Sequence, residues 1–154
     1  FIKLKKFAQQ ILDICDELKI KPVVWGGLAY FAYTKERNYA IKDIDFLVPG
    51  KSINKIMGIL KKKRIKHKYI ADWHSLVISK GDLKVELDPV EQYYSGRKKF
   101  QKYDLNGLVV DIVSLDNLIG MYRRASKASR DKAEQHKKRL DTLIGIRTIK
   151  KKTH

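Results

Sequence analysis

Apolar residues recur at helical spacing at the start of the chain. Four of them, from Phe7 to Leu18, fall on one face of a helix that we expect over about residues 3–18. Residues 23–25 then predict a short buried strand. A glycine pair separates this strand from a second helical pattern over 28–33.

Strand patterns dominate the middle of the chain. Residues 43–48 predict a second strand, and Ser52 is expected to cap the helix that follows. Two more strands, over about 75–79 and 83–87, are joined by a turn that contains glycine.

The last third of the chain combines one strand with two helices. We expect a strand over 108–113, a helix from Ser114 to about Tyr122, and an amphipathic helix over 131–146. Helices therefore surround short strands, which predicts an α+β fold with a small, mixed, twisted sheet flanked by helices. We expect one domain over 1–148, followed by a basic tail at 149–154.

The charge balance narrows the choice of partners. The 154 residues contain 34 Lys and Arg against 17 Asp and Glu, a net charge of +17. Such a field attracts nucleic acid, nucleoside triphosphates or acidic membrane surfaces, although a general surplus of surface lysine explains it equally well. No stretch approaches the roughly 20 apolar residues of a membrane span, so we expect no membrane-spanning segment.

The chain contains one cysteine, Cys15, and therefore has no partner for an internal disulfide. This fits a reducing compartment, and we expect a cytoplasmic protein. The first residues are too charged for a signal peptide. Because Phe1 stands where Met would begin a protein, we expect a few native residues before it.

Gly26 and Gly27 lie directly after a predicted strand and before a predicted helix. Glycine allows a tight turn there and lets an anion approach the amide groups at the helix N-terminus. A tight turn without a ligand is the alternative interpretation of the pair alone.

Carboxylates alternate with apolar residues on two of the predicted strands. Asp43 and Asp45 share one strand face, as do Glu86 and Asp88. Neighbouring carboxylates repel unless a cation neutralises them, and carboxylate oxygens suit Mg²⁺. If the two strands are adjacent, the acids form a cluster suited to two-metal phosphoryl chemistry. Surface acids paired with lysines are the alternative.

The order of these motifs along the chain resembles the nucleotidyltransferase superfamily with its polymerase-beta-like catalytic core. The resemblance extends from about Val23 to Leu140 and is greatest for the small aminoglycoside and lincosamide nucleotidyltransferases. It rests on Gly26-Gly27, then Asp43-Ile44-Asp45, then the segment 81–89 with Glu86 as third acid. A Glu at this third position departs from the usual pattern.

The resemblance implies a mechanism and a set of site residues. Asp43, Asp45 and Glu86 would be catalytic and would hold Mg²⁺ or Mn²⁺, with Glu86 as the base that accepts the acceptor hydroxyl proton. The triphosphate would contact Gly26, Gly27 and the two aspartates. Further candidates for the site, apart from these, are Lys42 for the nucleotide and Asp88, Arg37, Arg123, Lys127 and Lys132.

The acceptor stays open at this stage. The resemblance implies transfer of a nucleoside monophosphate from a nucleoside triphosphate to a hydroxyl on RNA, a small molecule or a protein. A toxin-like nucleotidyltransferase of a toxin–antitoxin pair and a non-catalytic, basic nucleic-acid-binding module with the same fold are the alternatives. The positive charge favours RNA over a cationic antibiotic.

Overall fold

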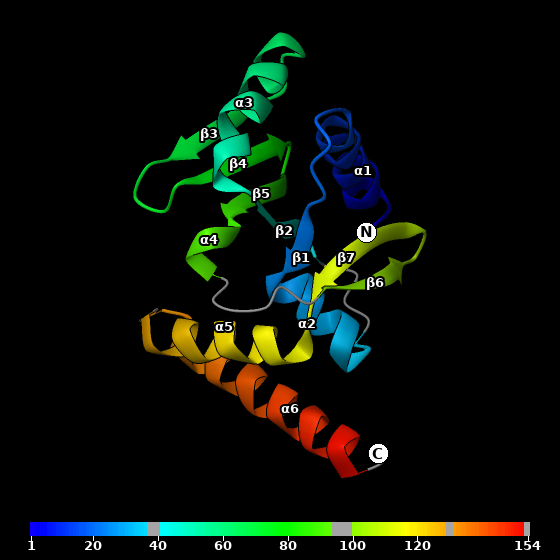
Figure 1. Ribbon diagram of the computed structural model, residues 1–154, viewed down its shortest axis with the longest axis vertical. Helices are drawn as coiled ribbons and strands as arrows, with labels where there is room; N and C mark the ends of the chain where they lie inside the picture. The colour runs from blue at the N-terminus through cyan, green and yellow to red at the C-terminus, as the bar shows by residue number, and fades with distance from the viewer. Residues whose placement is uncertain (37–40, 94–99, 129–130, 153–154) are drawn as a thin grey trace.

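The computed structural model describes residues 1–36, 41–93, 100–128 and 131–152, and a seven-stranded mixed sheet forms its centre (Figure 1). The strands are β1 (Val23–Trp25), β2 (Asp43–Val48), β3 (His67–Ile70), β4 (Ser75–Lys80), β5 (Leu83–Pro89), β6 (Phe100–Leu105) and β7 (Leu108–Val113). The helices are α1 (Ile2–Glu17), α2 (Gly26–Thr34), the 3₁₀ turn η1 (Gly50–Ser52), α3 (Ile53–Lys62), α4 (Val90–Tyr93), α5 (Leu115–Ala128) and α6 (Ala133–Lys152).

The strand order is β3-β4-β5-β2-β1-β7-β6. β1 pairs antiparallel with β2 and parallel with β7, and β2 pairs parallel with β5. Two antiparallel units, β3-β4-β5 and β6-β7, complete the two sides of the sheet. The predicted α+β class with a mixed sheet is confirmed.

Strand alternation gives the sheet two unlike faces around β2 and β5. Ile44 and Phe46 of β2 and Val85 and Leu87 of β5 are fully buried in the core, to which α1 and α3 also contribute. The lone cysteine, Cys15, is buried on α1 in the same core. The acidic residues of β2 and β5 lie on the other face, because side chains alternate along a strand.

The last two helices form a pair beside the sheet. α5 and α6 pack along each other, and α2 contacts both of them (Figure 1). Leu140 and Leu143 of α6 are buried in this contact region. In the part of the chain that the structure describes, no helix has the length and apolar character needed to cross a membrane.

Several elements differ from the sequence prediction. Strands β3 and β6 were not predicted, and α2 begins at Gly26, two residues earlier than expected. The hydroxyl of Ser52 donates to the carbonyl of Pro49 rather than capping α3. Ser114 does cap α5, since its hydroxyl accepts the backbone N–H of Asn117 at 3.2 Å. Both last helices extend beyond their predicted ends, α6 as far as Lys152.

Candidate active site

Three acidic side chains converge where β2 lies beside β5. The parallel register places Asp45 opposite Glu86, with Asp88 two residues further along β5 on the same face. One carboxylate oxygen from each of the three lies within 4.8 Å of the others. The sequence prediction that acids from these two strands meet is therefore correct for Asp45 and Glu86, and Asp88 joins them.

Asp88 lies at the bottom of this cluster and is held from two sides. Its side chain is 2% exposed. The indole Nε1–H of Trp25 donates to Oδ2 at 3.0 Å, and the hydroxyl of Ser75 donates to Oδ1. Burial, and then the charge of Glu86, raise the pKa of Asp88 to about 7, although these two hydrogen bonds favour the charged form. With a donor on each oxygen, Asp88 is suited to fixing the cluster in place.

Asp45 and Glu86 bring their carboxyl groups together, with one oxygen of each within 4.8 Å of the other. The pKa of Asp45 is raised well above its usual range, first by burial, then by Glu86, Asp88 and Asp43. A bound divalent cation would relieve the repulsion between these carboxylates. The donor set consists of carboxylate oxygens, and it fits a hard cation such as Mg²⁺ or Mn²⁺.

The glycine pair lies against the acids at the start of α2. Gly26 has a φ of +69°, and a Cβ added to it would lie 2.6 Å from Oδ2 of Asp45. A side chain at this position would therefore both strain the backbone and displace the aspartate. Gly27 faces α6, where an added Cβ would lie 3.5 Å from Nη1 of Arg139.

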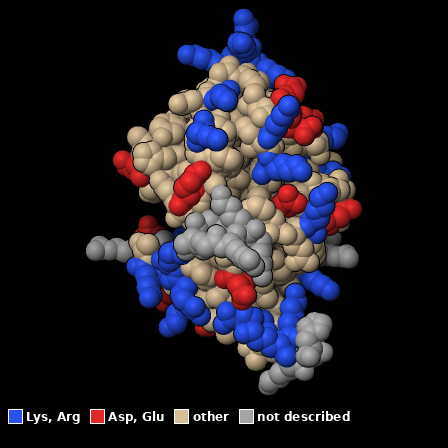
Figure 2. All heavy atoms as spheres, in the orientation of Figure 1, with Lys and Arg blue, Asp and Glu red and all other residues tan. Residues whose placement is uncertain are grey.

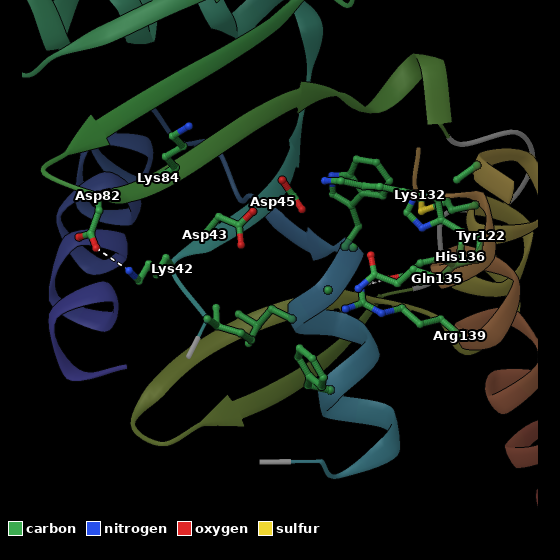
Figure 3. Close-up of a pocket in the computed structure, with 18 residues that line it drawn as sticks. Lys42, Asp43, Asp45, Asp82, Lys84, Tyr122, Lys132, Gln135, His136 and Arg139 are labelled. Carbon is green, nitrogen blue, oxygen red and sulfur yellow. Dashed lines mark hydrogen bonds and ion pairs between the residues drawn. The ribbon is translucent and has the colours of Figure 1, made fainter. Parts of the chain in front are cut away.

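A pocket of about 620 Å³ opens beside the acids and the glycine pair. Asp43 and Asp45 extend into it from β2, while residues of α5 and α6 form the opposite wall (Figure 3). Lys42, at its rim, forms an ion pair with Asp82 at 2.8 Å. The pocket thus has an acidic wall, glycine backbone at a helix N-terminus, and basic side chains, which together suit a metal-bound polyphosphate.

Arg139 is held at the wall of this pocket by three aromatic side chains. Its Nη1–H donates to the hydroxyl of Tyr122 at 3.2 Å. Its guanidinium also lies 5.0 Å from the ring centre of Tyr30 and 5.4 Å from that of Phe31. These contacts orient the guanidinium towards Gly27 and the pocket before any anion arrives.

His136 lies one helical turn from Arg139 on α6 and also lines the pocket. Its ring centre is 5.6 Å from that of Tyr122. The buried Nδ1 has no hydrogen-bond partner among the described residues. Burial, and then the charges of Arg139 and Lys132, lower the pKa of this imidazole, which is therefore neutral at pH 7.

Comparison with solved structures identifies the fold. The complex of ANT(2")-Ia with adenylyl-2"-tobramycin superposes with a TM-score of 0.69 at 16% identity, over 97% of this chain and 94% of that one. The lincomycin-bound lincosamide adenylyltransferase LnuA gives 0.61 at 14% identity, over 90% and 96%. A nucleotidyltransferase-like protein from Paracoccidioides brasiliensis gives 0.64 at 16%, over 93% and 76%.

The chain has the nucleotidyltransferase fold. The resemblance that the sequence motifs indicate is thereby confirmed at the level of fold, including the likeness to the aminoglycoside and lincosamide branch. Neither a protein-family model nor the sequence of a curated protein matches the chain.

Within this nucleotidyltransferase fold, the remaining candidate residues lie at different distances from the acids. Asp43 is exposed at the pocket rim and is not one of the three converging carboxylates. Lys132 lines the pocket, whereas Arg123 and Lys127 are exposed on α5 and are not among its lining residues. Arg37 lies outside the described residues.

Arg139 and His136 were not among the residues that the sequence analysis singled out. The resemblance implies a cation for the nucleotide in this part of the chain, with Arg123, Lys127 and Lys132 as candidates, but it does not say which one. The spacing of His136 and Arg139, three residues apart and hence on one helix face, is the signal that was present. It becomes informative only once α6 is known to pack on α2.

Proposed function

We propose that this protein is a metal-dependent nucleotidyltransferase that transfers a nucleoside monophosphate from a nucleoside triphosphate to a hydroxyl acceptor. The observation that carries the proposal is the convergence of Asp45, Glu86 and Asp88 within 4.8 Å beside a glycine turn and a pocket with basic walls. A purely nucleic-acid-binding module would gain nothing from a partly buried cluster of repelling acids.

Asp45 and Glu86, with Asp43 at the rim, are the residues that would hold Mg²⁺ or Mn²⁺. A divalent cation bound there would neutralise charge on the triphosphate and orient it. Asp88 positions the cluster through its hydrogen bonds from Trp25 and Ser75.

The triphosphate would lie against the N-terminus of α2. Gly26 and Gly27 allow its oxygens to reach backbone N–H groups there. Arg139 and Lys132 from α6 and its approach, and Lys42 from the rim, would balance its charge. Arg139 needs no rearrangement for this role, because Tyr122, Tyr30 and Phe31 already hold it.

Glu86 would act as the base in this proposal. It would accept the proton of the acceptor hydroxyl while the hydroxyl oxygen attacks the α-phosphorus. The bond from the α-phosphorus to the bridging oxygen breaks, and pyrophosphate leaves with that oxygen. The acceptor gains a nucleoside monophosphate, and the proton passes from Glu86 to solvent.

The test combines binding with transfer. Calorimetry should show triphosphate binding in the presence of Mg²⁺ or Mn²⁺ and little without it. The variant Asp45→Ala should fold but lose the metal-dependent binding, because removing one of several repelling acids does not harm the apo protein. Labelled triphosphates incubated with RNA, antibiotics or the protein itself should then yield a labelled acceptor. Equal affinity in the variant would contradict the proposal.

A further inference from the structure

Beyond Glu86, on the side away from the glycine turn, the sheet face that carries the acids also carries partly exposed residues. On β4, Leu76 and Ile78 are fully buried, whereas Val77 and Ser79, which point to the opposite face, are only half-buried. Val77 is paired with Glu86, so the partly exposed surface of β4 belongs to the same face as the acids. This face therefore continues directly from the catalytic cluster.

Lysines lie along this face. In β3, Lys68 is paired with Val77, so the cross-strand row runs Asp45, Glu86, Val77, Lys68. At a strand spacing of about 4.8 Å, the row spans roughly 14 Å from Asp45 to Lys68. A positive charge thus ends a row that begins at the acids.

A second cross-strand row beside it also leads from an aspartate of β2 to lysines. It runs from Asp43 through Lys84 to Ser79, and the backbone N–H of Ser79 donates to the carbonyl of Lys66 at 3.0 Å. Lys66 and Lys68 are both exposed and stand two residues apart, as expected for one strand face. None of these three lysines forms an ion pair with a described carboxylate.

The hairpin that carries the first row also carries an exposed aromatic ring at its turn. Trp73, in the turn between β3 and β4, is 61% exposed. Its carbonyl accepts the hydroxyl of Ser75, which also donates to Asp88, so this turn is tied to the acidic cluster. Proteins that bind single-stranded nucleic acid combine basic side chains with exposed aromatic rings, and this hairpin offers both.

The topology separates the two substrates. The glycine turn and α6 lie on the β1 side of Asp45, where the triphosphate is proposed to bind, and β4 and β3 lie on its other side. Lys84 of β5 lies at the junction, since it also lines the triphosphate pocket. We infer that Lys66, Lys68 and Lys84, with Trp73, form the acceptor-binding surface, and that the acceptor is a single-stranded polynucleotide whose hydroxyl reaches Glu86. This inference rests on the proposed nucleotidyl transfer.

The charge of this surface disfavours a cationic acceptor. An aminoglycoside carries several ammonium groups, which the three lysines would repel. The rest of the molecule supports the choice, because Lys and Arg are spread over the upper and lower parts of the face shown in Figure 2 and the net charge is +17. Such a field speeds the arrival of a polyanion.

The experiment measures binding of a fluorescent 12-nucleotide single strand, as RNA and as DNA, by anisotropy between 50 and 200 mM KCl. The double variant Lys66→Glu/Lys68→Glu should weaken binding of at least one of the two strands by about tenfold or more. The log–log salt slope should fall by about 1.4, because each of the two phosphates that the lysines no longer neutralise accounts for about 0.7.

The matched control is Lys6→Glu/Lys55→Glu, which changes the net charge equally on α1 and α3, the helices that contribute to the core on the buried side of the sheet. It should weaken binding by less than about threefold. Equal losses in the two double variants, or binding that does not respond to salt, would overturn the acceptor surface.

Calorimetry with metal and triphosphate separates this inference from the proposed function. Both double variants should bind the metal–triphosphate complex as tightly as the wild type. If the wild type binds no triphosphate but the polynucleotide results are as expected, the proposed enzymatic function is wrong and the polynucleotide-binding surface stands. If the wild type binds the metal–triphosphate complex but the polynucleotide results are not as expected, the acceptor is not a polynucleotide and the proposed enzymatic function stands.

Discussion

The buried carboxyl group of Asp88 makes the stability of the fold depend on pH. Burial and Glu86 raise its pKa to about 7, compared with about 3.9 in an unfolded chain. The folded state therefore holds the proton more tightly, and this carboxyl lowers the free energy of unfolding as the pH rises from about 4 to about 7.

We expect the variant Asp88→Asn, without metal, to melt about 5 °C or more above the wild type at pH 8. The difference should shrink towards pH 4, where the wild-type carboxyl is protonated in the folded protein. Calorimetric melting curves at several pH values measure this. Parallel curves for the two proteins would show that Asp88 does not titrate in this range.

Gly26 is constrained both by its backbone conformation and by its contact with Asp45 in the proposed catalytic site. Its φ of +69° and the 2.6 Å approach of Asp45 to an added Cβ both exclude a larger side chain. Gly26→Ala should cost about 1–3 kcal/mol of unfolding free energy and strongly weaken metal–triphosphate binding. Urea unfolding and calorimetry measure the two effects.

Gly58 provides the matched control for that substitution. It lies inside α3, and an added Cβ there meets nothing within 4 Å. Gly58→Ala should therefore stabilise the protein by about 0.5–1 kcal/mol and leave nucleotide binding unchanged. A similar loss in both variants would mean that the contact with Asp45 is unimportant.

Among the helices, α6 packs against α5 and α2 partly through the contacts of Arg139. Arg139→Ala removes a hydrogen bond to Tyr122 and the stacking on Tyr30 and Phe31, so we expect a loss of about 1–2 kcal/mol. Triphosphate affinity should fall as well, and Arg139→Lys should restore little of either, because an ammonium group cannot stack and donate in the same way.

The neighbouring Lys138 serves as control for that helix. It is exposed on α6 and does not line the pocket, so Lys138→Ala should change stability by less than about 0.5 kcal/mol and leave affinity unchanged. Urea unfolding and triphosphate titration compare the two variants. Equal behaviour would mean that Arg139 contributes only its net charge.

The elements that were predicted from sequence are those with a buried face. β1, β2 and β7 have the expected bounds, since buried β-branched and apolar side chains mark them. The two edge strands, β3 and β6, were missed because an edge strand pairs on one side only and most of its side chains are exposed. Their polar sequences therefore lack an apolar alternation.

The candidate site divides in the same way. The acids on β2 and β5 could be predicted, because i and i+2 residues share a strand face and the two motifs share one pattern. The contribution of α6 could not, because Arg139 reaches Gly27 through packing between helices that are far apart in sequence. The hydrogen bond from Trp25 to Asp88, 63 residues apart, is hidden for the same reason.

For the whole molecule, the surplus of 17 positive charges has a cost as well as a use. Like charges repel in the compact state, and dissolved salt screens them over about 10 Å at 0.1 M. We expect the melting temperature to rise by several degrees between 10 and 150 mM NaCl. The double variant Lys6→Glu/Lys55→Glu, with its lower net charge, should respond less. A melting temperature that falls with added salt would contradict this account.

Cys15 gives the chain a natural reporter of its own opening. It is the only cysteine, it is fully buried on α1, and burial raises its pKa to about 12. A disulfide reagent attacks the thiolate, so labelling must wait until α1 separates from the sheet. At low reagent concentration the labelling rate would measure the equilibrium population of the open form, and at high concentration it would level off at the opening rate. The opening of α1 can therefore be measured in the unmodified protein, without an engineered cysteine.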